Sequence, residues 1–346
     1  GYFGKIGSGY GTNNRYAADG MLNGFNKKLQ ISTVGAINNV NKTANSIQAL
    51  IKSNTYKGDN NSIDYQSDFT RAGINQGTTA GSIFQYDFIS DPTFRKSKRL
   101  NADYYYSKNQ ETINSNRRIN TFLLADSILA NTSTIEREVR NMSNSLSAKY
   151  TQQDENFSLS FATDVSFNKN DYTNMDTGES SRTGTIGLLS STNSLDINDN
   201  TQRKWSFSST FVHRITSSDR DYTDKKKRYP FDNFTLSYKF TTEDNDGNNN
   251  NYATIKSNVN PDLNKYFDRS YRKYNHKTSH SVDLAYPDFK KLIFGNSYLW
   301  GINVELLATV NLFNNTVDNL VQDKDSTTMQ NQVNPYLTIV RDEYVG

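Results

Sequence analysis

The residues with the clearest potential to bind a metal ion form one acidic run, DNDG at residues 244–247. In an EF-hand loop, glycine occupies the sixth position, an acidic residue the first and a glutamate the twelfth. With Gly247 as the sixth residue, those two positions are Thr242 and Ala253. The run is therefore not an EF-hand, and a solvated loop is favoured over a loose calcium site.

Other catalytic and cofactor motifs are incomplete. A dinucleotide fingerprint starting at Gly7 requires a glycine at position 12, which is Thr12, and a helix where the pattern predicts a strand. His213, His276 and His280 have no nearby acid at metal-ligand spacing, and we find no Gly-x-Ser-x-Gly elbow or convincing carboxylate pair. We therefore expect no enzyme, no cofactor and no metal site.

Polar side chains that alternate with apolar ones remain as the candidates for function. Between Asn156 and Asn168, the odd-numbered residues from Phe157 to Phe167 are mainly apolar, and the residues between them are mainly small or polar. Successive side chains of a strand point to opposite faces, so this segment has an apolar and a polar face. Eleven residues is about the length that crosses a bilayer as a tilted strand. A soluble β-sandwich could use the same pattern with its apolar face turned inward.

The same alternation recurs along the chain and predicts about eleven strands. We expect them at residues 1–11, 15–25, 29–39, 78–88, 100–107, 143–152, 157–167, 205–214, 233–242, 278–286 and 298–312. Their connections alternate between short turns and polar segments of roughly 30 or more residues, although the segment 216–232 is longer than this rhythm requires. Short periplasmic turns and long outer loops are typical of outer-membrane barrels. The sequence thus predicts an all-β, antiparallel transmembrane β-barrel.

Composition is compatible with this prediction. The 346 residues include 22 Tyr and 19 Phe but no Cys, and the mean hydropathy is −0.79. No run approaches the 18 apolar residues of a membrane-spanning helix, whereas a β-barrel needs only alternate apolar residues. A net charge of +3 is too small to indicate a nucleic-acid partner. The opening at Gly1, without Met or a signal peptide, suggests a piece of a longer protein.

The first 41 residues, GYFGKIGSGYGTNNRYAADGMLNGFNKKLQISTVGAINNVN, carry a family resemblance. They resemble the first barrel strands of the TonB-dependent-receptor-like outer-membrane proteins of Bacteroidetes, which follow directly on a plug domain. The resemblance implies a plugged barrel of about 22 strands. Residues 1–346 would then be a partial barrel domain, without the plug and the C-terminal half.

The resemblance also implies partners and a function. The partners are outer-membrane lipid, the protein's own plug and, for energised uptake, TonB and a surface lipoprotein. The basic run at 225–228 could contact lipopolysaccharide phosphates, although a solvated basic turn explains it equally well. The implied function is nutrient binding and uptake at the cell surface. The alternatives are a non-transporting outer-membrane scaffold that anchors a lipoprotein, adhesion or secretion complex, and a soluble sandwich or adhesin.

If the apolar faces meet lipid, the polar residues of the same strands face the barrel lumen. The candidate lumen-facing residues are Asp103, Lys149, Asp164, Lys239, Asn303 and Glu305. Charges cost little in a wet lumen and can contact a plug or a solute there. Plug packing or plain water contact is the simpler reading of these positions.

Overall fold

The computed structural model describes residues 1–42, 73–93, 95–123, 128–182, 187–214, 233–287, 289–294, 304–325, 328 and 330–345. These residues are almost entirely β-structure. The strands are β1 (Tyr2–Tyr10), β2 (Tyr16–Phe25), β3 (Leu29–Asn38), β4 (Ile74–Asp87), β5 (Ser97–Phe122), β6 (Ile128–Gln153), β7 (Phe157–Arg182), β8 (Gly187–Arg214), β9 (Asn233–Ser257), β10 (Lys265–Tyr286), β11 (Leu306–Lys324), β12 (Asn331–Val333) and β13 (Ile339–Val345). Two short helices interrupt them, the 3₁₀ helix η3 (Pro261–Leu263) and α2 (Phe289–Phe294). No helix in the described part is long and apolar enough to cross a membrane.

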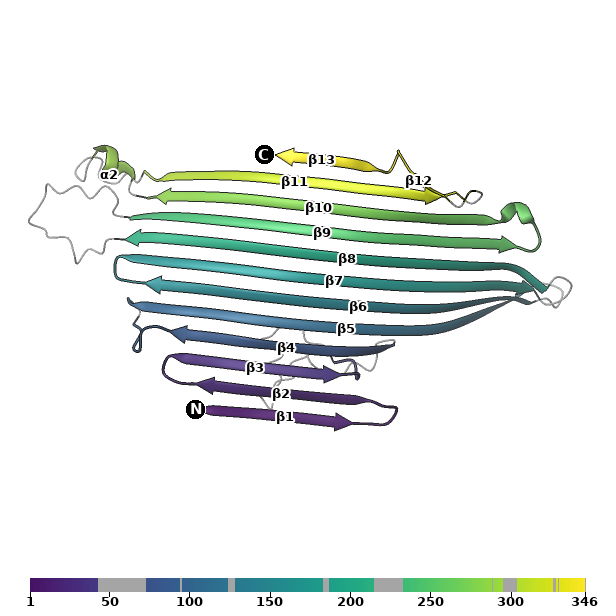
Figure 1. Ribbon diagram of the computed structural model, residues 1–346, viewed down its shortest axis with the longest axis horizontal. Coiled ribbons are helices and arrows are strands. Elements are labelled where there is room, and N and C mark those ends of the chain that lie inside the picture. Colours follow the sequence, from purple (N-terminus) through teal and green to yellow (C-terminus); the bar gives the residue numbers. More distant parts are fainter. Residues whose placement is uncertain are drawn as a thin grey trace, which may run out of the picture.

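All of these strands belong to one sheet (Figure 1). From β1 to β11 each strand pairs antiparallel with the next along the chain, and both β12 and β13 pair with β11. The all-β, antiparallel prediction is therefore confirmed. The described strands form one sheet and not the two stacked sheets of the sandwich alternative. Among the described residues, β1 pairs only with β2 and lies at one edge of the sheet.

Short polar turns set the register of the hairpins. Asn13 and Asn14 adopt φ angles of 57° and 56°, as the two central residues of a type I′ turn do. Asparagine tolerates this left-handed conformation better than most residues. The backbone twist of a type I′ turn matches the twist of the flanking strands. The predicted hairpin between β6 and β7 is also confirmed, with a turn at residues 154–156 and Ser158 opposite Gln153.

Each strand presents an aromatic face and a polar face. In register across β6 to β9, Tyr150 lies opposite Phe161, Phe161 opposite Ser209, and Ser209 opposite Tyr238. We call this side of the sheet the aromatic face. The polar face is the opposite side, and carries the alternate residues of the same strands. The aromatic face is not covered, since Trp205 is 46% exposed and Leu236 is 43% exposed.

The expectation of long outer loops is wrong for residues 108–142, 169–204 and 243–277, because most of that polar sequence forms strands. The polar segment at 43–72 lies outside the described residues. β5, β6 and β7 each contain 26 residues and β8 contains 28, whereas β1 contains 9 (Figure 1). Only five residues separate β5 from β6, and four separate β7 from β8. Both faces of these extensions are rich in Asn, Ser, Thr and charged residues, so apolar periodicity does not reveal them. In these described segments the polar sequence therefore lengthens the strands instead of forming loops.

The last strands also differ from expectation. In place of the strand predicted at 298–312, β11 begins at Leu306 and continues to Lys324. Val304 and Glu305 precede it in irregular structure. β12 pairs with residues 322–324 of β11, and β13 pairs with residues 314–319. β13 was not predicted, and the run 298–303 lies outside the described residues.

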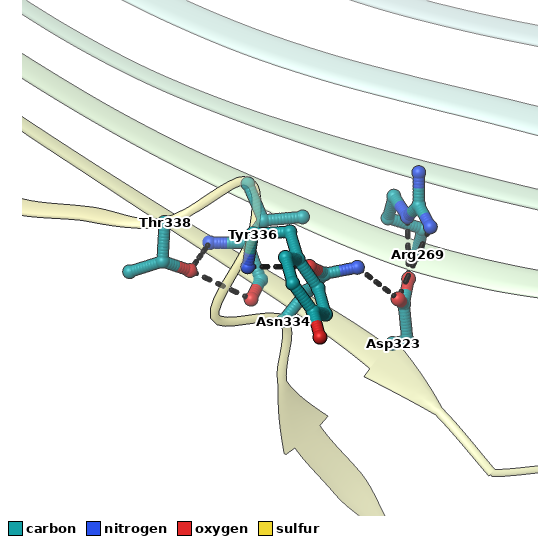
Figure 2. Close-up of polar contacts among 6 residues, drawn as sticks. Arg269, Asp323, Asn334, Tyr336 and Thr338 are labelled. Atoms are coloured by element: carbon teal, nitrogen blue, oxygen red, sulfur yellow. Dashed lines mark hydrogen bonds and ion pairs between the residues drawn. The ribbon is translucent and has the colours of Figure 1, made fainter.

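The turn between β12 and β13 is fixed to β11 by side-chain hydrogen bonds (Figure 2). The Asn334 amide donates to Asp323 Oδ2 at 2.8 Å. The Thr338 hydroxyl accepts a hydrogen bond from the backbone N–H of Val321 at 3.1 Å and donates one to the Val321 carbonyl oxygen at 3.2 Å. Val321 is only 1% exposed beneath this turn. The turn therefore holds the edge of β11 along part of its length.

A small apolar cluster lies on the polar face near the N-terminal edge. It contains Met21, Val34, Ala36 and Tyr105, with Ile83 packed against it. Val34 is 2% exposed. The polar face is therefore not uniformly hydrophilic, which the alternation in β5 to β9 alone did not indicate.

Candidate ligand-binding face

Four of the predicted lumen-facing residues share the polar face. Asp103 lies opposite Ser147, which lies opposite Asp164, so the two carboxylates occupy one cross-strand row. Lys149 and Lys239 occupy the adjacent row, separated by Ala162 and Ser208. Side chains of one row on neighbouring strands are about 5 Å apart. The structure thus brings an acidic row beside a basic row on one face.

The other two predicted residues are not in this group. Glu305 is exposed and lies just before the first residue of β11, outside the ladder. Asn303 lies outside the described residues, as does the basic run at 225–228. The lumen-facing assignment of the whole set stays a prediction.

Further along the strands, beyond the rows of Ser166 and Asn168, the polar face becomes rich in side-chain amides, a feature that the sequence analysis missed. The Ser166 row carries Lys204 and Glu243. One row crosses four strands as Asn109, Asn141, Asn170 and Asn200, each directly opposite the next. The next row, two residues further along β7, runs as Tyr172, Asn198, Asn249 and Tyr271. We call these two rows the amide field. The tetrad of asparagines at 248–251 was assigned to a loop, but it lies within β9.

Hydrogen bonds within the amide field fix its side chains. Asn170 Nδ2 donates to Asn141 Oδ1 at 2.5 Å, and Asn109 Nδ2 donates to Ser107 Oγ at 3.1 Å. In the row below, Ser143 Oγ donates to Asn168 Oδ1 at 2.6 Å. These residues line a shallow hollow of about 260 Å³, to which Met142, Lys169 and Gln202 also contribute. The field is therefore a hydrogen-bonding surface rich in amides, with a recess that Lys169 borders.

One cluster of charged residues lies on the other face, beside the amide field. Lys169 Nζ bridges Asp171 and Asp199 at 3.2 and 3.3 Å, and these residues alternate with Asn168, Asn170 and Asn200. The hydrogen bonds that the Lys169 ammonium donates to both carboxylates raise the pKa of Lys169. Alternation therefore places this ion-pair cluster on the opposite face from Asn168, Asn170 and Asn200.

A histidine–carboxylate contact was also missed in the sequence. His276 Nδ1 lies 2.5 Å from Asp244 Oδ1, and His276 Nε2 lies 3.0 Å from the Thr278 hydroxyl. The acid comes from the neighbouring strand, directly opposite the histidine, so sequence spacing did not indicate it. Within the described ranges no three His, Cys, Asp or Glu side chains are placed to hold a metal. The acidic run at 244–247 lies within β9 and not in a loop.

The aromatic face carries a belt of ring contacts that extends from β4 to β10. Tyr86 contacts Phe88, and the belt continues through Tyr150, Phe161, Phe207, Tyr238 and His280, with the centroids of successive rings 4.9–6.4 Å apart. Such contacts stabilise neighbouring strands beyond simple burial. We call the apolar part of the aromatic face the apolar band; on β7 it extends from Phe157 to Phe167. The belt of rings crosses the middle of this band.

A second apolar feature lies at the same face near α2. Phe211, Phe234, Leu284 and Phe289 are among the residues that line a hollow of about 510 Å³ there. Its exposed lining is almost entirely hydrocarbon, although His213 and Tyr286 also border it, so it offers few hydrogen bonds. The candidate for solute recognition is therefore the polar face.

Comparison with protein-family models, with curated proteins and with solved structures finds no match to this chain.

Proposed function

We propose that this chain forms part of an outer-membrane β-barrel of the TonB-dependent-receptor-like kind, which binds a nutrient at the cell surface for uptake. In this proposal the aromatic face contacts lipid and the polar face lines the barrel interior. The long strand extensions of β5 to β10 stand outside the membrane and carry the amide field.

The observation that carries the proposal is an uncovered apolar band on one face of a single sheet. Val165, Trp205 and Leu236 are each more than 40% exposed on it. Soluble monomers rarely expose a contiguous apolar patch of more than a few hundred Å². Eleven residues from Phe157 to Phe167 rise roughly 33 Å along the strand, or about 25 Å across a bilayer at the usual tilt. That height equals the apolar band of outer-membrane barrels, about 25 Å.

The edges of the sheet support a larger barrel. β1 exposes Ile6 at 89% and has a free edge in the described part of the chain. Residues 306–313 of β11 pair only with β10 among the described strands. Long free edges promote aggregation, and closure into a barrel removes them. Further strands that pair with both edges would close the wall.

The membrane assignment is tested by fractionation of cells that express the full-length protein. We expect it in the outer-membrane fraction, and we expect a folded form that migrates faster on a gel before heating than after it. A full-length protein that stays in the soluble fraction without detergent would overturn the proposal. The Phe161→Arg variant of the aromatic face serves as the structural control.

Uptake and scaffolding require a separate measurement. Accumulation of a labelled nutrient in cells with the full-length protein, lost when the proton-motive force is collapsed, is expected for energised transport. An outer-membrane protein that retains surface partners but supports no accumulation would instead be the scaffold.

A further inference from the structure

We propose that Asp244, His276 and Thr278 form a hydrolytic triad that cleaves carboxylic esters of membrane lipids. We call these three residues the triad. It lies on the aromatic face, at the outer end of the apolar band. The choice of a lipid as substrate rests on the proposed function, which places this face against the bilayer. The inference departs from the expectation of no enzyme, because that expectation considered only spacing along the sequence.

The three side chains have the geometry of an acid, a base and a nucleophile in series. His276 Nδ1 lies 2.5 Å from Asp244 Oδ1, and His276 Nε2 lies 3.0 Å from the Thr278 hydroxyl oxygen. His276 and Thr278 are two residues apart on β10 and share a face, and Asp244 is directly opposite His276 on β9. A hydroxyl bonded to a histidine that an acid orients is the arrangement that activates nucleophiles on unrelated folds.

Hydrogen-bonding rules fix where the protons of the triad lie. An ionised carboxylate only accepts hydrogen bonds, so His276 Nδ1 must be the donor to Asp244. In the neutral imidazole, Nε2 is then the acceptor, and the Thr278 hydroxyl must donate to it. The Tyr274 hydroxyl donates to the same Asp244 oxygen at 3.3 Å and helps to hold the carboxylate in place. His276 is therefore oriented to take the proton of Thr278.

A donor for the developing oxyanion lies on the next strand. Asn314 on β11 is directly opposite Thr278, which places their Cβ atoms about 5 Å apart. Asn314 is exposed, and its amide supplies two N–H donors. Asparagine amides stabilise the oxyanion of acyl-transfer reactions in this way. Thr278 thus has a base on its own strand and a neutral donor beside it.

The position of the triad in the apolar band suits a lipid ester. Thr278 lies in one cross-strand row with Val165 and Trp205. His276 lies in the row of Phe167, where the band ends on β7. The ester groups of a bilayer lie between the hydrocarbon core and the headgroups, in the interfacial region. The hydroxyl of Thr278 is therefore at the depth where an outer-leaflet lipid presents its esters.

Apolar side chains below Thr278 can receive the acyl chain. Toward the middle of the band, the same face of β10 carries Val282 and Leu284. Val282 is 40% exposed, and Leu284 borders the hydrocarbon-lined hollow of about 510 Å³. A chain that lies over these residues brings its own ester to Thr278 and leaves the headgroup in water.

The proposed reaction is hydrolysis in two steps. Thr278 Oγ1 attacks the ester carbonyl carbon while its proton passes to His276 Nε2, and the oxyanion accepts a hydrogen bond from Asn314. Collapse breaks the ester C–O bond, and the leaving alcohol takes the proton from His276. Water then attacks the acyl-threonine and gives a proton to His276, which returns it to Thr278 as the carboxylic acid leaves. One ester and one water thus give one alcohol and one acid.

The test is ester hydrolysis by the purified full-length protein. The probes are dioleoyl phosphatidylethanolamine in dodecyl maltoside micelles and the water-soluble ester p-nitrophenyl butyrate. We expect both to be cleaved, and we expect a fluorophosphonate reagent to label Thr278, as located by mass spectrometry. Thr278→Val, which replaces the hydroxyl by a methyl group, should lower kcat at least about 100-fold. Thr278→Ser, which keeps a hydroxyl, should retain activity.

Two further variants separate chemistry from binding. Asp244→Asn exchanges an acceptor for an amide that can donate to Nδ1, so it favours the wrong tautomer of His276. Asn314→Leu removes the oxyanion donor. Each should lower kcat about 100-fold with little change in KM, because neither residue binds the acyl chain. A purely structural role of these residues would leave kcat of the folded protein unchanged.

The matched control is Thr242→Val, which removes the same hydroxyl on β9 directly opposite Thr278. It should leave both rates unchanged, and all variants should keep the heat-modifiable migration of the folded form. Cleavage of neither ester, no loss in Thr278→Val, or an equal loss in the control would overturn the inference. Cleavage of p-nitrophenyl butyrate alone would overturn the lipid as substrate. A soluble protein without heat-modifiable migration would overturn the proposed function itself, and the butyrate assay then tests the triad separately.

Discussion

Arg269 on β10 and Asp323 on β11 are direct cross-strand partners, and their side chains form two parallel hydrogen bonds (Figure 2). Arg269 Nε donates to Asp323 Oδ1, and Nη2 donates to Oδ2 at 3.1 Å. Bidentate pairing of this kind is among the stronger side-chain interactions. The Asn334 amide adds a third donor to the same carboxylate. One carboxylate thus joins β10 and β11 to the turn that precedes β13.

Removal of the charge at this carboxylate should loosen the turn. Asp323→Asn keeps the shape of the side chain, but it weakens the bond from Asn334 and the ion pair with Arg269. We expect several-fold faster hydrogen exchange at the backbone amides of residues 334–338, measured on the full-length protein by mass spectrometry. Asp318→Asn, on the other face of the same strand, is the control and should have little effect. Unchanged exchange in Asp323→Asn would show that the turn is held by Thr338 and the backbone alone.

The same contact should be sensitive to acid. The Arg269 guanidinium holds the pKa of Asp323 below its usual value, and the Asn334 amide lowers it further. A carboxylate with a lowered pKa in the folded state stabilises that state above the unfolded pKa of about 3.9, and this contribution is lost as the pH falls through the folded value. We compare the exchange of the backbone amides of residues 334–338 with their intrinsic exchange rates at each pH. We expect this ratio to be steady from pH 7 to pH 5 and to rise below about pH 4. In Asp323→Asn this acid-dependent step should be absent.

Lys169 holds together two aspartates that face each other. Asp171 and Asp199 are directly opposite across β7 and β8, and like charges in that position destabilise a strand pair. Lys169→Met keeps the length of the side chain but removes the bridging charge. We expect a loss of about 0.2–1 kcal/mol in local stability, read from hydrogen exchange along β7 and β8. Adding salt should reduce the difference between the variant and the parent protein, and a difference that grows with salt would contradict this account.

The sequence predicted the strands that carry an apolar face. Phe157 to Phe167 and its partner Ser143 to Gln152 are paired as expected, because alternating apolar and polar residues specify both a strand and its orientation. The polar turn at Asn13 and Asn14 was also recognisable, since these residues favour the left-handed conformation that the turn requires. These predictions rest on local sequence alone.

The extensions and the amide field were missed for one physical reason. Residues such as Asn170 and Asn200 are poor strand formers by composition, and both faces of their strands are polar, so no period in hydrophobicity marks them. The apolar band sets the register between these strands. The backbone hydrogen bonds then continue in the same register into the polar extension, which therefore also forms strands. His276 and Asp244 meet for the same reason, since cross-strand pairing and not sequence spacing brings them together. Contacts that depend on register between distant segments are not visible in a single sequence.

The orientation of the wall can be tested by matched substitutions on adjacent residues. Phe161 lies on the aromatic face and Ala162 on the polar face of β7, at almost the same depth in the apolar band. An arginine that faces lipid near the midplane costs about 2–4 kcal/mol, whereas a lumen-facing arginine stays in water. We therefore expect Phe161→Arg to reduce folding into lipid vesicles strongly and Ala162→Arg to reduce it much less, as measured by the fraction that becomes heat-modifiable. Phe161→Leu, which keeps the apolar character, separates the effect of charge from the loss of ring contacts. If Ala162→Arg is the more harmful of the two, the polar face meets lipid and the orientation proposed for this protein is reversed.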